Sequence, residues 1–214
     1  MLEASELLED YILEHIDAEP SELHRLYRHT HLHHLYPRMC SGHYQGRLLK
    51  MLTTMVKPGR ILELGTYTGY ATLSMAEGMP DDCHLDTVEI DDEKADELTE
   101  RFASSPYAGR IHLLIGDALD VVSRTNRTWD MVFIDANKRH YGDYLRAVLP
   151  KVAIGGYILV DNTLWDMKVV TGNFGHDEQA RAIARFNDEV ARDERLEKVI
   201  LPVRDGLTII RRVR

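Results

Sequence analysis

Oxygen-bearing side chains stand directly after two short apolar runs of this chain. Asp135 follows a run that ends at Ile134, and Asp161 and Asn162 follow a run that ends at Val160. Carboxylate and amide oxygens are the ligands that hard cations such as Mg²⁺, Ca²⁺ and Mn²⁺ prefer, and three of them leave positions for water or a bidentate diol. We therefore predict a divalent-cation site, with Mg²⁺ as the expected ion. The competing interpretation is that Asp161 and Asn162 only cap a loop.

Lys138 stands three residues after Asp135 in the sequence. An amine beside a cation gives up its proton more readily than an isolated one, because the charged form is disfavoured there. Such an amine can take a phenolic proton as a general base. Lys138 and Asp135 are therefore the predicted catalytic residues, and a solvent-exposed lysine is the competing interpretation.

A turn that contains two glycines, residues 63–70, follows the first apolar run. Glycines let the backbone approach a ligand, and a helix that begins after them points amide hydrogens at it. The spacing Gly65-x-x-x-Gly69 differs from the G-x-G-x-x-G pattern of dinucleotide-binding folds. This difference disfavours a bound pyrophosphate, and with it a nicotinamide oxidoreductase.

Two further acids stand where a nucleoside would need them. Glu89 follows Gly65 at close to the ~20-residue distance at which an acid holds a ribose. Asp117 ends the next apolar run and can accept from an adenine amino group, while Ala118 leaves room for the ring. A ribose and an adenine without a pyrophosphate indicate S-adenosylmethionine. Read separately, each acid can also be an exposed strand-end residue.

Alternating apolar runs and helical stretches from Arg60 onward predict the elements that position these residues. The continuous apolar runs are typical of parallel strands buried on both faces: 61–64, 84–90, 111–115, 131–134 and 157–160. Helical stretches lie between them at 72–78, 93–103 and 141–149. The pattern predicts an α/β fold, a Rossmann-like, doubly wound, mostly parallel sheet. Ligands bind such sheets beyond the carboxyl ends of the strands, where the acids stand.

The two ends of the chain have their own patterns. Residues 199–203 and 207–213 read as a C-terminal antiparallel strand pair joined by a tight turn at Asp205-Gly206. Residues 1–56 predict an N-terminal helical cap, with helices around 7–16, from 21 towards 36, and over 44–56. We therefore expect a single domain over 1–214, with the cofactor- and metal-binding core at 57–214.

A histidine-rich stretch within residues 24–34 remains outside this scheme. His29 and His33 are one helical turn apart, which is a spacing that zinc ligands use. The sequence suggests no third ligand for them, so a solvated or subunit-facing helix is the expected role.

Composition narrows the class of protein. The chain has 214 residues and a formal net charge of −9, with a sequence pI near 5.6, which argues against a binder of nucleic acid or of anionic membranes. Two cysteines cannot form a disulfide framework, and the acidic N-terminus is unlike a signal peptide. No apolar run approaches the length of a membrane span. A cytoplasmic protein without membrane or nucleic-acid partners is expected.

Several stretches in a fixed order resemble one enzyme family, the caffeoyl-CoA and catechol O-methyltransferases: 63–70, 88–91, 116–118, 133–138, 155–165 and 205–212. The resemblance covers roughly residues 37–214. It implies a cation-dependent, class I S-adenosylmethionine enzyme that methylates a small aromatic vicinal diol, a catechol-like or phenylpropanoid acceptor. It also implies a homodimer.

The resemblance assigns roles by position in this chain. It implies cofactor contacts for Met39, Ser41, Glu63, Gly65, Tyr67, Gly69, Tyr70, Glu89, Ile90, Asp117, Ala118 and Asp135. It implies that Asp135, Asp161 and Asn162 hold the metal, that Lys138 is the catalytic lysine, and that Tyr144 and Trp165 line the substrate pocket.

This chain departs from the family pattern in the segment that shapes the acceptor pocket. Residues 166–169 replace a common x-Gly-x-Val, and the following segment is short. Outside this segment, Ala71 stands where many relatives carry Ser, which costs at most one hydrogen bond to the cofactor. The identity of the acceptor therefore stays open. Two alternatives also stay open: a metal-independent small-molecule methyltransferase and a non-catalytic regulatory protein that binds S-adenosylmethionine.

Overall fold

The computed structural model describes residues 2–214, and the side chains from residue 7 onward. Its centre is a seven-stranded sheet with the strand order β3-β2-β1-β4-β5-β7-β6. The first five strands are parallel, and β7 runs antiparallel to both β5 and β6. The strands are β1 (Arg60–Leu64), β2 (His84–Glu89), β3 (Ile111–Ile115), β4 (Trp129–Ile134), β5 (Val152–Val160), β6 (Leu196–Leu201) and β7 (Leu207–Arg212). The predicted Rossmann-like sheet with its antiparallel end is confirmed.

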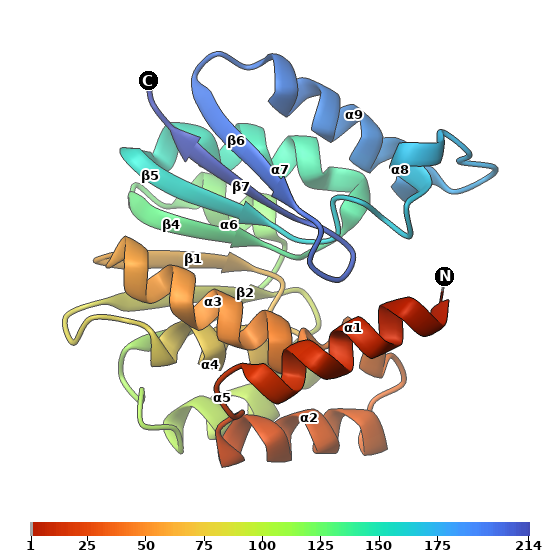
Figure 1. Ribbon diagram of the computed structural model, residues 1–214. Coiled ribbons are helices and arrows are strands. Elements are labelled where there is room, and N and C mark those ends of the chain that lie inside the picture. Colours follow the sequence, from red (N-terminus) through yellow and green to blue (C-terminus); the bar gives the residue numbers. More distant parts are fainter. Residues whose placement is uncertain (1) are drawn as a thin grey trace.

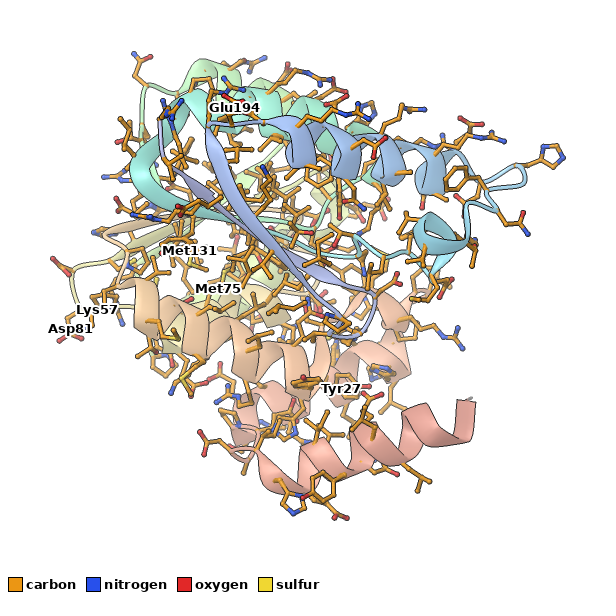
Figure 2. All side chains as sticks on the ribbon, turned by 45° about the horizontal axis from the view of Figure 1, so that its top comes forward. Tyr27, Lys57, Met75, Asp81, Met131 and Glu194 are labelled. Carbon is orange, nitrogen blue, oxygen red and sulfur yellow. The ribbon has the colours of Figure 1, made fainter. Side chains whose placement is uncertain are left out.

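Helices cover both faces of the sheet (Figure 1). One face carries α3 (Gly42–Val56), α4 (Tyr70–Glu77) and α5 (Ala95–Ala103), and the other carries α6 (Ala118–Arg124), α7 (Tyr141–Val148) and α9 (Glu178–Arg192). An apolar cluster fills the space on each side. Met75 of α4 and Met131 of β4, both fully buried, meet in the layer beneath α3 and α4 (Figure 2). Burial on both faces explains why the strands are continuous apolar runs.

The N-terminal cap consists of α1 (Leu2–His15), α2 (Ser21–His33) and α3. The structure ends α2 at His33, short of the predicted Tyr36, because Pro37 starts a separate 3-10 turn, Pro37–Met39. Residues 34–39 therefore lie outside the helix, and residues 35–39 border the cavity described below. None of the helices within residues 2–214 combines the length and apolar character needed to cross a bilayer.

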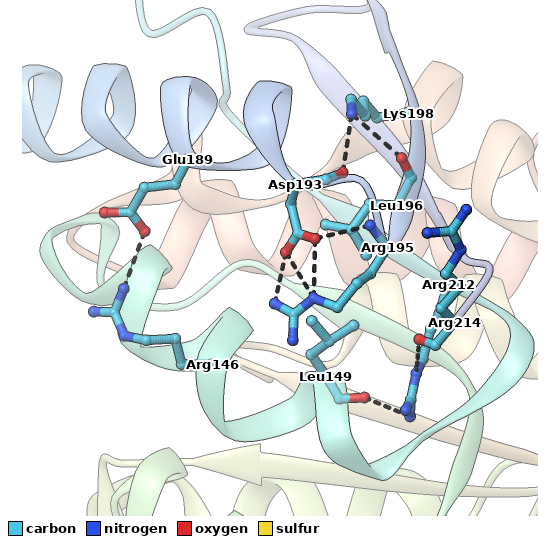
Figure 3. Close-up of polar contacts among 9 residues, drawn as sticks. All are labelled: Arg146, Leu149, Glu189, Asp193, Arg195, Leu196, Lys198, Arg212 and Arg214. Atoms are coloured by element: carbon cyan, nitrogen blue, oxygen red, sulfur yellow. Dashed lines mark hydrogen bonds and ion pairs between the residues drawn. The ribbon is translucent and has the colours of Figure 1, made fainter.

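The C-terminal part differs from the sequence expectation in two details. The strands β6 and β7 are joined by residues 202–206, a longer connection than the tight turn predicted at Asp205-Gly206. The pattern of Ala180, Ile183, Phe186 and Val190, all buried, marks helix α9, which the sequence analysis did not assign. Side chains tie this region together: Arg146 of α7 pairs with Glu189 of α9, and Arg195 with Asp193 before β6 (Figure 3).

Candidate active site

A cavity of about 1050 Å³ lies beyond the carboxyl ends of the parallel strands. Its walls come from the segments that follow β1, β2, β3, β4 and β5, together with residues 35–41 of the cap and the β6–β7 connection. The strand order reverses between β1 and β4, which is where open α/β sheets bind ligands. The cavity borders most of the predicted site residues: Met39, Ser41, Gly65, Tyr67, Tyr70, Glu89, Ile90, Asp117, Ala118, Asp135, Lys138, Tyr144, Asp161, Asn162 and Trp165.

Strand register brings the acids to one edge. Ile134 at the end of β4 pairs with Val160 at the end of β5, so Asp135 and Asp161 follow paired residues on adjacent strands. The amide of Asp161 donates to the carbonyl of Ile134 at 3.0 Å. Two residues far apart in the chain therefore become neighbours because the parallel strands end together.

Gly65 is needed where β1 and β4 end side by side. Its φ is +99°, and a Cβ there would lie 2.3 Å from the carbonyl oxygen of Asp135. No residue with a side chain fits this position, because its Cβ would displace the backbone at Asp135. The glycine at 65 thus fixes how closely the two loops approach at the cavity wall.

Glu89 and Asp117 are anchored by backbone amides. The Glu89 carboxylate, 7% exposed, accepts from the amide of Tyr67 at 2.7 Å and from the amide of Asp91 at 3.0 Å. Asp117 Oδ1 accepts from the amide of Leu119 at 2.8 Å and so caps α6. Each carboxylate has further acceptor capacity for a ligand. The cofactor roles of both residues remain predictions.

Two predicted cofactor contacts, those of Glu63 and Gly69, are not found at the cavity wall. The Glu63 carboxyl is fully buried and accepts from the hydroxyls of Thr72 and Thr87. Burial raises the pKa of Glu63 to about 8, so the carboxyl is mostly neutral at pH 7. Gly69 lies against the ring of Phe102 at the start of α4. Glu63 thus precedes the glycine turn and Gly69 ends it, and neither residue lines the cavity.

Tyr70 also differs from the prediction. It borders the cavity at the start of α4, but its hydroxyl donates to the Glu19 carboxylate in the segment between α1 and α2. The phenol is 2% exposed, and a Cβ on Gly46 would lie 2.9 Å from its ring. The hydroxyl is therefore committed to the helical cap, which the sequence did not predict. The residue still borders the cavity, and its contact with the methionine portion stays a prediction.

The two acids of the predicted metal site differ in environment. Asp135 Oδ1 accepts from Lys138 Nζ at 2.6 Å. The Asp161 carboxyl is buried, and this burial, to which the Asp135 charge adds, raises its pKa to about 6. Asp161 Oδ1 accepts from the amide of Asn162 at 2.8 Å, and Asn162 has a left-handed φ of 57°. Asp135 and Asp161 thus share this edge with the Lys138 amine, and the charges of Lys138 and Arg204 oppose the rise in the pKa of Asp161 without cancelling it.

Gln45 and Arg204 complete this part of the cavity, and the sequence analysis missed both roles. Arg204, in the β6–β7 connection, donates to the carbonyl of Ser41 and to Gln45 Oε1 at 2.7 Å. The buried Gln45 Nε2 has no hydrogen-bond partner within residues 7–214. The contact joins residues 159 positions apart. In the sequence, only the adjacent Asp205-Gly206 turn hints at this contact.

The predicted substrate-pocket residues, Tyr144 and Trp165, both border the cavity. Tyr144 of α7 is 5% exposed, whereas Trp165 lies in the loop after β5, where Trp165, Asp166 and Met167 all have positive φ. Three consecutive non-glycine residues in this region are strained and are held by tertiary contacts. Asp177 provides them: its Oδ2 accepts from Trp165 Nε1 at 2.9 Å and from Lys168 Nζ at 2.6 Å.

Comparison with known proteins identifies the family. The sequence model of the O-methyltransferase family matches residues 14–213. The chain belongs to the O-methyltransferase family. The predicted family and enzyme class, an S-adenosylmethionine-dependent O-methyltransferase, are confirmed.

Individual relatives agree with this membership. This O-methyltransferase is 31% identical over 225 residues to caffeoyl-CoA O-methyltransferase 5 of Nicotiana tabacum, covering 98% of this chain and 92% of the relative. It is 32% identical over 225 residues to caffeoyl-CoA O-methyltransferase 1 of Arabidopsis thaliana, with 98% and 85% covered.

Solved structures share the fold of this O-methyltransferase. An SAH-bound methyltransferase from Podospora anserina superposes with a TM-score of 0.90 at 26% identity, covering 98% of this chain and 95% of the other. An O-methyltransferase from Streptomyces achromogenes involved in tomaymycin synthesis, solved with SAM, gives 0.87 at 25% identity, with 97% and 96% covered.

Proposed function

We propose that this O-methyltransferase transfers the methyl group of S-adenosylmethionine to one hydroxyl of a small aromatic vicinal diol, in a site completed by a divalent cation. The observation that carries the proposal is the pair Asp135 and Asp161, two carboxylates that the register of β4 and β5 brings to the same cavity edge. The printed names of the plant relatives, caffeoyl-CoA O-methyltransferases, support an acceptor of the phenylpropanoid kind.

The residues at this edge fit a hard cation. Burial and the Asp135 charge raise the pKa of Asp161 although Lys138 and Arg204 act against them, so a bound cation would stabilise the ionised pair. Asn162 adds a neutral oxygen, and the donor set of two carboxylates and one amide suits Mg²⁺, with Ca²⁺ and Mn²⁺ as alternatives. A bound cation would lower the pKa of a diol hydroxyl and hold the diol in place.

Lys138 is the base in this proposal. Its Nζ lies 2.6 Å from Asp135 Oδ1, so the Asp135 carboxylate fixes the amine at the cavity wall. The amine would act in its neutral form, which a cation bound beside it favours, and would take the phenolic proton as the oxygen attacks the methyl carbon. The new bond joins this oxygen to the methyl carbon, and the bond from that carbon to the sulfonium sulfur breaks. Positive sulfur and negative oxygen are both neutralised, so exclusion of water favours the step.

The other end of the cavity suits the nucleoside of the cofactor. Glu89 and Asp117 end neighbouring strands, and the amides that anchor them fix where their remaining acceptor sites point. The main gain in rate comes from holding the two reactants together, which can supply on the order of 7–11 kcal/mol. Met39, Ser41, Gly65 and Tyr67 form the wall between these acids and the metal edge.

The test is methyl transfer from labelled S-adenosylmethionine to a panel of ortho-diphenols. We expect turnover with added Mg²⁺, loss of turnover in EDTA, and recovery when Mg²⁺ is returned. Asp161→Asn should remove turnover with folding kept. Asp120→Asn, an exposed acid on α6 that pairs only with Arg124 among the described residues, is the matched control and should behave as the wild type.

Other outcomes of the same assay would identify the alternatives. Full turnover in EDTA would show a metal-independent methyltransferase and contradict the cation site. Tight binding of S-adenosylhomocysteine without methylation of any diphenol would support the regulatory role instead. The homodimer and the cytoplasmic location are part of the proposal, and native mass measurement tests the first of them.

A further inference from the structure

We propose that His29, His34 and Glu97 form a second metal site, separate from the cavity edge at Asp135, which binds Zn²⁺ and joins the end of α2 to α5. Among the side chains of residues 7–214, this is the group of three His, Cys, Asp or Glu residues whose ligand atoms all lie within 4.8 Å of one another.

The distances are close to those of a zinc site. The Nε2 atoms of His29 and His34 each lie 3.7 Å from Glu97 Oε1. Ligand atoms about 2.0–2.2 Å from a tetrahedral zinc are separated by roughly 3.4 Å. The ligand atoms of the two imidazoles lie within 4.8 Å of each other. The two His–Glu separations therefore need a shift of a few tenths of an ångström, and side-chain rotation closes the His–His separation, with water in the fourth position.

The sequence alone could not supply this third ligand. It offered His29 and His33, one helical turn apart, on the same face of a helix. The structure ends α2 at His33 and leaves His34 in an extended conformation, which turns its ring towards α5. Glu97, in the first turn of α5, then completes the group from a distant part of the chain.

The burial and the chemistry of the group favour a metal. The His34 side chain is 15% exposed, whereas those of His29 and Glu97 are 46% and 36% exposed, which leaves an entry path from solvent. Two imidazoles and one carboxylate are a donor set that zinc uses and Mg²⁺ does not.

Among residues 7–214, the Arg101 guanidinium already pairs with this carboxylate. Its Nη2 donates to Glu97 Oε1 at 2.5 Å from the next turn of α5. A carboxylate has two oxygens and can accept from a guanidinium while it binds a metal, and ligating carboxylates are commonly held in this way. Arg101 therefore orients Glu97, and it also competes for the oxygen that now faces the histidines.

The site adjoins the cofactor cavity. The His34 ring packs edge-on against Tyr67, with 5.7 Å between ring centres, and the Tyr67 hydroxyl donates to the carbonyl of Tyr36 at 3.1 Å. Tyr36 and Tyr67 both border the cavity. A zinc ion that ties α2 to α5 would thus hold the segment from which the cap reaches over the cavity.

The experiment is a Zn²⁺ titration against a chromophoric zinc chelator, with excess Mg²⁺ present to fill oxygen sites. We expect one tightly bound zinc per chain and a rise of the melting temperature with zinc. His29→Ala and Glu97→Gln should each weaken binding by about 10–100-fold or more, at least as much as the loss of a residue that merely orients a ligand. Circular dichroism checks that these variants fold.

Two control variants and one spectroscopic measurement make the result specific. His31→Ala removes an exposed histidine of the same helix that is not in the group, and should bind zinc as the wild type. Asp161→Asn should also bind zinc normally, because the proposed Mg²⁺ site is separate; its failure to methylate would not affect this result. X-ray absorption of the zinc complex should show two imidazoles and oxygen ligands.

The proposal is contradicted if the wild type binds no zinc at one per chain, or if Glu97→Gln binds it unchanged. Loss of binding in His33→Ala with no loss in Glu97→Gln would instead assign the zinc to the His29 and His33 pair on the helix surface, and would equally overturn the three-residue site.

Discussion

Lys138 Nζ lies 2.6 Å from Asp135 Oδ1, and both residues border the cavity where the sheet reverses its strand order. The pair arises because the turn after β4 starts a short 3-10 segment at Lys138. An amine fixed by a carboxylate at the wall of a cavity is placed to remove a proton from a bound hydroxyl.

This placement predicts the effect of replacing the lysine. Lys138→Arg keeps a positive charge beside Asp135 but cannot accept a proton, because arginine stays protonated. We expect kcat to fall by about 10²–10⁴-fold in single-turnover assays, with little change in the dissociation constant of S-adenosylhomocysteine. Equal losses in kcat and in cofactor binding would contradict the assignment of Lys138 as the general base. Lys151→Arg, a lysine bonded to carbonyls behind α6, is the matched control.

Glu89 offers a prediction about the other end of the cavity. Glu89→Gln keeps an oxygen for one of the two loop amides, turns an NH₂ group towards the other, and removes the charge that a ribose hydroxyl pair would meet. The loss of charged hydrogen bonds of about 1.5–3 kcal/mol should raise the calorimetric dissociation constant of S-adenosylhomocysteine about 10- to 100-fold. At saturating cofactor, kcat should stay near that of the wild type. An unchanged dissociation constant would refute the ribose assignment.

Glu63 gives a prediction about stability rather than activity. Burial raises its pKa from 4.5 to about 8, so between these values the folded protein holds more protons than the unfolded chain. The free energy of unfolding therefore falls as pH rises, by up to about 1.4 kcal/mol per pH unit for this group. Glu63→Gln, which stays neutral, should flatten that fall.

Urea unfolding in the presence of a chelator measures this effect. The informative window is about pH 6.5–8, above the range in which Asp161, with a pKa of about 6, titrates. The wild type should lose stability across this window and Glu63→Gln should lose less. The same slope in both proteins would mean that the Glu63 carboxyl is already ionised in the folded state.

Much of the sheet and of its acidic edge could be predicted from the sequence. Parallel strands buried on both faces leave continuous apolar runs, and the residue after each run is placed by the end of its strand. Asp135, Asp161 and Asn162 were found in this way, and the structure brings them to one cavity. Glu63 was assigned wrongly because a strand-end acid and an acid one pleat earlier look alike in a sequence, although only the first faces the cavity.

Contacts that cross the fold could not be predicted. Arg204 reaches Gln45 from a connection near the other end of the chain, and the Tyr70 hydroxyl donates to Glu19 of the cap. The grouping of His34 with Glu97 depends on how α2 ends and on where α5 begins. Each of these depends on tertiary packing that leaves no periodic signal in the sequence.

In the proposed function, the cofactor and the cation bind next to each other at the same edge of the sheet. A crystal soaked with S-adenosylhomocysteine and Mn²⁺, with diffraction recorded at the manganese absorption edge, tests it most directly. We predict one anomalous peak among Asp135, Asp161 and Asn162, next to the cofactor in the same cavity. A peak elsewhere, or a cofactor that binds away from these residues, would contradict the account.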